Sequence, residues 1–162
     1  MYSQQPDQDV SMRNSAAHKK FSQTYGAVLL LLLCAATILF HTFLASQKAL
    51  NINDRHYSLQ VVSTEAERAK GLGGRESMSA DQGMLFVFDR PEAACFWMKD
   101  MRFSLDIMWL DAGKRVIHVA RDVSPQTYPK SFCPPTPAKY VIELNAGEAA
   151  KSGITTGHTL KF

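Results

Sequence analysis

The feature that most constrains this chain of 162 residues is an uncharged, mostly apolar run from Tyr25 to Gln47. Because an α-helix rises about 1.5 Å per residue, about 20 apolar residues span the hydrocarbon core of a bilayer. The backbone of a single span must satisfy its own hydrogen bonds in lipid, and this requires a helix. The run therefore predicts one transmembrane helix over residues 25–47, with the lipid bilayer as its partner.

The charges that flank the apolar run favour an N-terminus in the cytoplasm. Three basic residues precede the run and two follow it closely, so the positive-inside bias is small but has this sign. A cleaved signal peptide is the alternative interpretation. However, the positions before a cut near Ala45 or Ala49 carry Phe43 or Gln47, where small residues are required. We therefore predict an uncleaved signal anchor.

The anchor divides the chain into a tail, a membrane segment and one domain. Residues 1–24 are polar and rich in Gln and Ser, which predicts a disordered cytoplasmic tail. Residues 51–162 suffice for one small domain, which we expect on the extracytoplasmic side of the cell membrane in a single-pass protein. The net charge of +3 is not concentrated in a basic stripe, so we expect no nucleic-acid partner.

The cysteines allow two interpretations. Cys34 lies in the apolar run, which leaves Cys95 and Cys133 as an even pair in the domain. In an oxidising compartment these two thiols can form a disulfide. The alternative is two buried, unpaired cysteines that act as small apolar residues. Cysteines and histidines show no CxxC, HxH or HExxH spacing, so we expect no metal site and no cofactor.

Short strands and turns dominate the domain. Alternating side chains predict a strand over residues 57–62. Thr64 and Glu67 have the spacing of a capping box, which predicts a short helix that ends at Gly71. Further strands are expected over residues 83–88, 95–98, 105–110, 116–120, 140–144 and 159–162, and a helical turn over 146–151.

Turn residues define the rest of the domain. Residues 111–114 are predicted to close a hairpin in which Gly113 has a positive φ. Residues 124–138 contain five prolines, which places this long loop outside the sheet interior. Many short strands with one or two short helices predict a mainly β domain, either a small β-sandwich or a barrel-like fold, preceded by the single transmembrane helix.

The densest group of chemically useful side chains lies at Trp97, Lys99 and Asp100. In a strand, Trp97 points away from the face that carries Phe96 and Met98. An indole beside a cation and a carboxylate suits a flat ligand or a sugar ring, because aromatic faces stack and charged groups orient the ligand. The alternative is that Trp97 fills the core and that Lys99 and Asp100 form an exposed turn.

Two carboxylates lie inside apolar strands, at Asp106 and Glu143. If both face one cleft, burial and mutual repulsion raise one pKa, as an acid/base pair requires. The alternative is that they bind backbone amides or pair with Arg68, Arg75 or Arg121. The chain has no GxSxG elbow, and we assign no catalytic residues.

Taken in order, several segments resemble the family called domain of unknown function 192 (DUF192). The most specific match is the sequence GMLF at residues 83–86 followed by FWMK at residues 96–99. The resemblance covers residues 57–162 and implies a compact mainly β domain, often exported behind a signal or anchor segment, with no established activity. Other matching segments are 68–72, 105–107, 140–144, 146–147 and 153–157. The signature positions it carries here are Arg68, Met84, Trp97, Met98, Lys99, Asp106 and Glu143.

These observations predict a membrane-anchored extracytoplasmic module that binds a small molecule, glycan or peptide without catalysis. Its expected ligand-binding residues are Arg68, Trp97, Lys99, Asp100, Asp106 and Glu143. Two other functions remain open. One is a hydrolase-like envelope enzyme that uses Asp106 and Glu143 as its acid/base pair. The other is a structural envelope adaptor, whose sign is a large exposed apolar patch.

Overall fold

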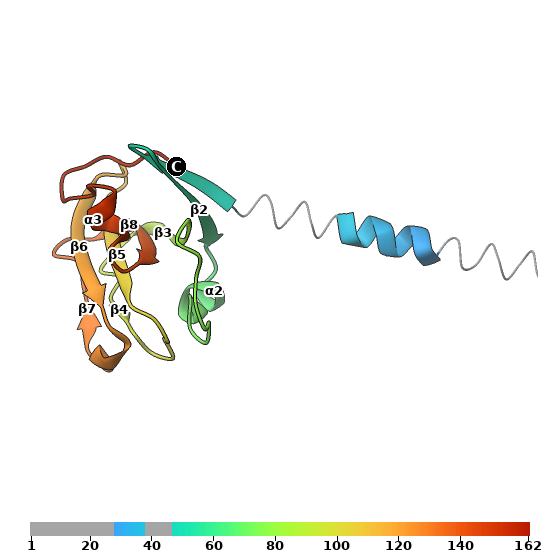
Figure 1. Cartoon of the computed structure of the whole chain (residues 1–162), viewed down its shortest axis with the longest axis horizontal. Helices are drawn as coiled ribbons and strands as arrows, with labels where there is room; N and C mark the ends of the chain where they lie inside the picture. The colour runs from blue at the N-terminus through green and yellow to red at the C-terminus, as the bar shows by residue number, and fades with distance from the viewer. Residues whose placement is uncertain (1–27, 38–46) are drawn as a thin grey trace, which may run out of the picture. The chain divides into compact units, whose positions relative to one another are not determined.

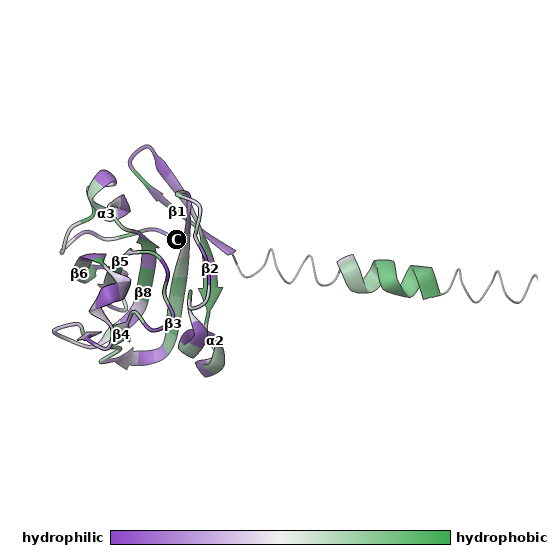
Figure 2. Cartoon of the chain, turned by 60° about the horizontal axis from the view of Figure 1, so that its bottom comes forward, coloured by the Kyte–Doolittle hydropathy of each residue, from purple (hydrophilic) through white to green (hydrophobic). Residues whose placement is uncertain are grey.

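The computed structural model describes residues 28–37 and 47–162, which belong to two separate units of the chain. Residues 28–37 form a helix whose side chains from Val28 to Leu33 are exposed, and Figure 2 shows this helix as hydrophobic. Within the described residues, no helix has both the length and the apolar character needed to cross a bilayer. The predicted tail and the rest of the predicted span, except Gln47, lie outside the described residues.

The second unit is built on a six-stranded sheet with the order β1-β2-β3-β8-β5-β6 (Figure 1). The mainly β prediction is confirmed. Among the described residues the sheet is open, with β1 and β6 at its ends, so the barrel-like alternative is wrong. The strands are β1 (Gln47–Ile52), β2 (Arg55–Val62), β3 (Gln82–Glu92), β5 (Leu105–Leu110), β6 (Val116–Val123) and β8 (Ala138–Asn145). The sheet thus begins before residue 51, where we predicted the start of the domain.

One crossover gives the sheet its only parallel pair among these strands. β2 and β3 run parallel, and helix α2 (Glu65–Lys70) lies in the connection between them, whereas all other neighbours in the sheet are antiparallel. The predicted capping box starts this helix: the Glu67 amide donates to Thr64 Oγ1 at 3.3 Å, and the Thr64 amide donates to Glu67 Oε2 at 3.0 Å. The helix ends at Gly71, whose φ of 49° suits glycine.

Each face of the sheet carries its own hydrophobic core, because successive side chains of a strand point to opposite faces. We call the first the α3 face, since helix α3 (Glu148–Lys151) contributes the buried Ala149 to it. Its core also contains Leu59, Leu85, Met108, Ile142 and Leu144. We call the second the ribbon face. Its core contains Met84, Phe86, Ile107, Trp109 and Val141.

A two-stranded ribbon of β4 (Phe96–Trp97) and β7 (Ser131–Phe132) packs on the ribbon face. Phe96 pairs with Phe132, and Trp97 pairs with Ser131. Next to these pairs, Cys95 and Cys133 form a disulfide with their Cα atoms 4.2 Å apart. Both cysteines are exposed. The alternative of two buried, unpaired cysteines is therefore wrong. The long loop before β7 contains a short 3₁₀ helix, η1 (Pro125–Thr127).

Three local predictions differ from the structure. β4 has two residues, where the sequence predicted a strand over 95–98. In the hairpin turn between β5 and β6, the residue with a positive φ is Lys114, at 62°, and not Gly113. The predicted last strand is reduced to a single bridge between Thr159 and Arg115. Each error concerns a short segment whose conformation depends on its packing partner.

Candidate functional site

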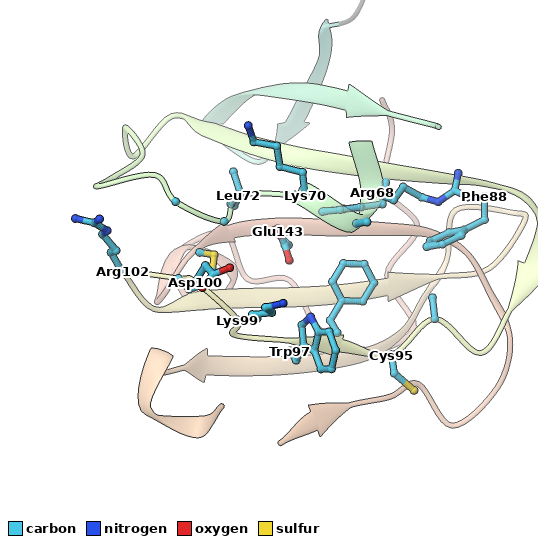
Figure 3. Close-up of a pocket in the computed structure, with 18 of the residues that line it drawn as sticks. Arg68, Lys70, Leu72, Phe88, Cys95, Trp97, Lys99, Asp100, Arg102 and Glu143 are labelled. Atoms are coloured by element: carbon cyan, nitrogen blue, oxygen red, sulfur yellow. The ribbon is translucent and has the colours of Figure 1, made fainter. Parts of the chain in front are cut away.

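A pocket of about 1080 Å³ opens on the ribbon face between α2 and the ribbon. One wall comes from α2 and the glycine-rich turn after it, with Arg68, Lys70 and Leu72 among its residues. The opposite wall comes from β4 and the turn after it, and includes Trp97 and Lys99. Figure 3 shows the side chain of Glu143, from the central strand β8, between these two walls.

The glycine-rich turn allows the two walls to meet at one end of the pocket. The Gly74 amide donates to the carbonyl oxygen of Asp100 at 2.9 Å. A Cβ atom on Gly73 would lie 3.1 Å from the Lys70 carbonyl oxygen and 3.6 Å from the Lys99 carbonyl oxygen. Such a close backbone approach favours glycine at this position. The sequence of this turn predicted only that the helix ends at Gly71.

The ribbon wall separates a core aromatic residue from an exposed one. Phe96 packs edge-to-face against Phe86 and Trp109, with ring centroids 4.8 and 6.0 Å away. The Trp97 side chain points away from the face that carries Phe96 and is 54% exposed, so it does not fill the core. The turn after it holds Asp100 in the left-handed region, with a φ of 58°. Lys99 and Asp100 are exposed, as the alternative interpretation expected, yet both line the pocket.

Glu143 is the chemically unusual residue of the pocket. It is 6% exposed, and no other group in the described residues forms a hydrogen bond or ion pair with its carboxyl group. Burial raises the pKa of Glu143 to about 8, although the positive charge of Arg75 opposes this shift. The Arg75 guanidinium donates instead to Gln60 Oε1 at 2.6 Å. At neutral pH the Glu143 carboxyl is therefore mostly protonated and can donate a hydrogen bond.

The four basic residues of the pocket differ in their availability. Arg68 donates to the carbonyl oxygens of Ser63 and Val87 and lies over the Phe88 ring. Arg102 pairs with Glu76 on the surface. In the part of the chain that the structure describes, Lys70 and Lys99 have no hydrogen bond or ion pair. These two lysines are available to a ligand.

Asp106 is the one predicted ligand-binding residue that lies elsewhere. Its Oδ1 accepts a hydrogen bond from the Asp122 amide and its Oδ2 from the Ala149 amide, each at 2.9 Å. The residue is buried and joins β5 to β6 and to the start of α3. It therefore binds backbone amides, which was the alternative in the sequence analysis.

The predicted acid/base pair of Asp106 and Glu143 is not formed. On β5 and β8, Asp106 lies opposite Leu144, and Ile107 lies opposite Glu143. Directly opposed residues share a face, and successive residues alternate, so the two carboxylates project from opposite faces of the sheet. The positions of the two carboxylates on opposite faces follow from the register of β5 on β8, which a single sequence does not reveal.

From the wall that α2 supplies, the sequence predicted only Arg68, and it missed the other lining residues of this wall and of β3. Lys70, Leu72, Phe86 and Phe88 all line the pocket, but their local sequence indicated only a helix end and a buried strand. The crossover from β2 to β3 places this helix beside the ribbon. A basic residue followed by four positions with three glycines was the available signal. In the described part of the chain, no group of three or more His, Cys, Asp or Glu residues could hold a metal ion.

Comparisons with known proteins bear on the family and the fold. The model of the DUF192 family, described as Uncharacterized ACR, matches residues 48–162. A crystal structure of a protein of unknown function from Novosphingobium aromaticivorans DSM 12444 is similar, with 28% identity and a TM-score of 0.67 over 72% of this chain and 85% of that chain. A protein from Sinorhizobium meliloti 1021, provisionally described as a transcription regulator, has 24% identity and a TM-score of 0.66 over 71% and 92% of the two chains. No curated protein matches the sequence.

Proposed function

The chain belongs to the DUF192 family, and we propose that its β domain is a non-catalytic module that binds a small anionic ligand in the pocket on the ribbon face. The observation that carries this proposal is that Glu143, Lys70 and Lys99 line one pocket and that none of them has a hydrogen-bond or ion-pair partner within the described residues. The protonated carboxyl donates a hydrogen bond to an oxygen of the ligand. The two ammonium groups attract its carboxylate or phosphate group.

Binding fits this pocket better than general acid/base catalysis does. Among the described residues, no second acid, base or nucleophile is hydrogen-bonded to Glu143, whereas such catalysis needs groups held in mutual reach. The adaptor alternative requires a broad exposed apolar patch. In residues 47–162, the exposed large hydrophobic side chains are Trp97 and Tyr128 only, and they are too few for that patch.

We propose further that residues 25–47 anchor this domain at the extracytoplasmic side of the cell membrane. Two observations support the location: the exposed apolar side chains from Val28 to Leu33 on a helix, and the Cys95–Cys133 disulfide, a bond that persists in oxidising compartments. In intact cells, a membrane-impermeant maleimide should label these two cysteines only after treatment with an impermeant reductant. Labelling only after cell lysis would contradict the proposed location.

The binding proposal can be tested with the full-length chain in detergent micelles. Isothermal titration at pH 7 with gluconate, an open-chain acid, should show binding that its uncharged counterpart sorbitol does not show. The double variant Lys70→Met, Lys99→Met should weaken gluconate binding about tenfold or more, since it removes both free cations. The control Lys161→Met, an exposed lysine near the C-terminus, should change the affinity less than twofold.

Glu143 provides a second arm of the same test. Glu143→Ala should weaken gluconate binding, because the donor is lost. Glu143→Gln should retain most of it at pH 7, because the amide still donates. Undetectable binding of every anion tried, or equal weakening by Lys161→Met, would refute the proposed function.

A further inference from the structure

Trp97, which lines the pocket, contacts a second exposed aromatic residue, Tyr128, and no contact in the fold explains why either ring stays exposed. Trp97 is 54% exposed and Tyr128 is 47% exposed, and they are the exposed large hydrophobic residues of the described β domain. Their ring centroids are 6.1 Å apart with an interplanar angle of 68°. Water-exposed indole surface forgoes the stabilisation that burial provides, so an ordered, exposed aromatic pair indicates an interaction site.

The pair is held in place from both sides. Trp97 belongs to the β4–β7 ribbon, which the neighbouring Cys95–Cys133 disulfide closes. Tyr128 follows η1, and its amide donates to the Pro125 carbonyl oxygen at 3.2 Å. Two segments that are distant in the sequence thus present one preorganised aromatic surface. Preorganisation lowers the entropy cost of binding.

The geometry of the pair rules out a ligand inserted between the two rings. Because Trp97 and Tyr128 touch edge-to-face, no gap separates two parallel rings in which a flat aromatic ligand could stack. For the same reason there is no groove between the rings of the kind that receives a proline-rich peptide. What remains is ring surface of Trp97 next to a polar pocket.

A sugar ring matches this combination. The C–H groups on one side of a pyranose are weakly positive and pack on the negative face of an indole. The hydroxyl groups at its rim need charged or polar partners. In Figure 3 Lys99 lies beside Trp97, and Asp100 and Glu143 line the same pocket. We infer that the ligand is an acidic carbohydrate, a pyranose that carries a carboxylate or phosphate and stacks on Trp97. This inference rests on the proposed function, which supplies the anionic group.

The experiment compares two acids that differ in the ring. The full-length chain in detergent is titrated at pH 7 with methyl glucuronide, whose pyranose is locked, and with gluconate, which has no ring. The wild-type chain should bind methyl glucuronide about tenfold more tightly than gluconate. Trp97→Ala should abolish this preference, and Trp97→Phe should restore part of it.

Phe162→Ala serves as the matched control, because this aromatic residue packs against Tyr140 away from the pocket. It should leave the preference intact. Equal affinity for the two acids would overturn the sugar inference while the proposed function stands, and binding of neither acid would remove both. Tighter binding of a proline-rich peptide than of methyl glucuronide, lost in Trp97→Ala, would also overturn it.

A third ligand distinguishes the two sources of such a sugar. A uronic acid tetramer that binds more tightly than the monomer would support the inference and assign the ligand to a polymer. Equal affinity of tetramer and monomer would support it and assign the ligand to a free sugar acid.

Discussion

The two faces of the sheet each bury one glutamate, and they treat it in opposite ways. On the α3 face, Glu148 accepts hydrogen bonds from Arg55 and Tyr57 at 2.9 Å each and from Lys151 at 2.7 Å. Burial tends to raise the pKa of Glu148, but its bonds to Lys151 and Tyr57 outweigh burial and lower that pKa below its usual value. On the ribbon face, Glu143 has no such partners among residues 28–37 and 47–162, and burial raises its pKa to about 8.

The two glutamates differ in what their carboxyl groups contact: that of Glu148 binds residues of the fold, and that of Glu143 lies at the pocket. Glu148 and Asp106 connect α3 to β2, β5 and β6, so the charges of the α3 face serve the fold. Glu143 lowers the stability of the folded chain at neutral pH, because the cost of burying its carboxyl group exceeds the favourable effect of the Arg75 charge. A side chain that is unfavourable for folding and open to a pocket supports the binding role proposed above.

The largest expected effect is the pH dependence that Glu143 imposes on stability. Between its ordinary pKa and about 8, the unfolded chain has released a proton that the folded chain keeps. The free energy of unfolding should therefore fall as pH rises through this window, by up to about 1.4 kcal/mol per pH unit. Glu143→Gln should remove this decline, as measured by urea unfolding of the full-length chain in detergent from pH 5 to 8. Parallel pH profiles of the two proteins would contradict the prediction.

Glu148 should show the opposite sign. Because its pKa is lowered in the folded chain, its contribution is present above the unfolded pKa and is lost as pH falls through the folded pKa. At pH 7, Glu148→Gln should lower the free energy of unfolding by about 2 kcal/mol, since charge-assisted hydrogen bonds are lost. The same unfolding measurements should show wild type and variant converging toward acid pH.

An exposed ion pair gives the control for Glu148. Glu76→Gln breaks the surface pair with Arg102, and should change stability by less than about 1 kcal/mol. If Glu76→Gln and Glu148→Gln cost the same, the buried network around Glu148 does not have the role assigned to it.

The smallest effect concerns the exposed tryptophan. Trp97→Ala should lower the free energy of unfolding by less than about 1 kcal/mol, because more than half of the side chain is already in water. Trp109, fully buried on the same face, is the reference: Trp109→Ala should cost about 4 kcal/mol. Thermal unfolding followed by circular dichroism compares the two. A large loss in Trp97→Ala would mean that this residue serves the fold and not a ligand.

The parts of this molecule that sequence could predict depend on near neighbours in the chain. The capping box of Thr64 and Glu67 lies within one helical turn, and the opposite directions of Phe96 and Trp97 follow from strand alternation. The mainly β architecture follows from the density of short strands and turns. Trp97, Lys99 and Asp100 are close in the chain, so the sequence could predict them as one group, and all three line the pocket.

The parts that sequence could not predict depend on how distant segments meet. The separation of Asp106 from Glu143 follows from the register of β5 on β8, and one residue of slippage would have placed them on one face. Likewise, Lys70 reaches the pocket because a crossover places α2 beside the ribbon. Neither the register nor the path of the crossover is encoded in a local pattern.

The β4–β7 ribbon has a consequence for how this domain opens. It contains two residue pairs, whereas the central strands form longer ladders, so we expect the ribbon to have a lower local stability than the sheet. The Cys95–Cys133 disulfide crosslinks the two segments of the ribbon. In a reducing environment, we expect the amides of the sheet to keep their slow hydrogen exchange while those of the ribbon exchange faster. Reduction of the disulfide would then change access to the Trp97 wall without unfolding the domain.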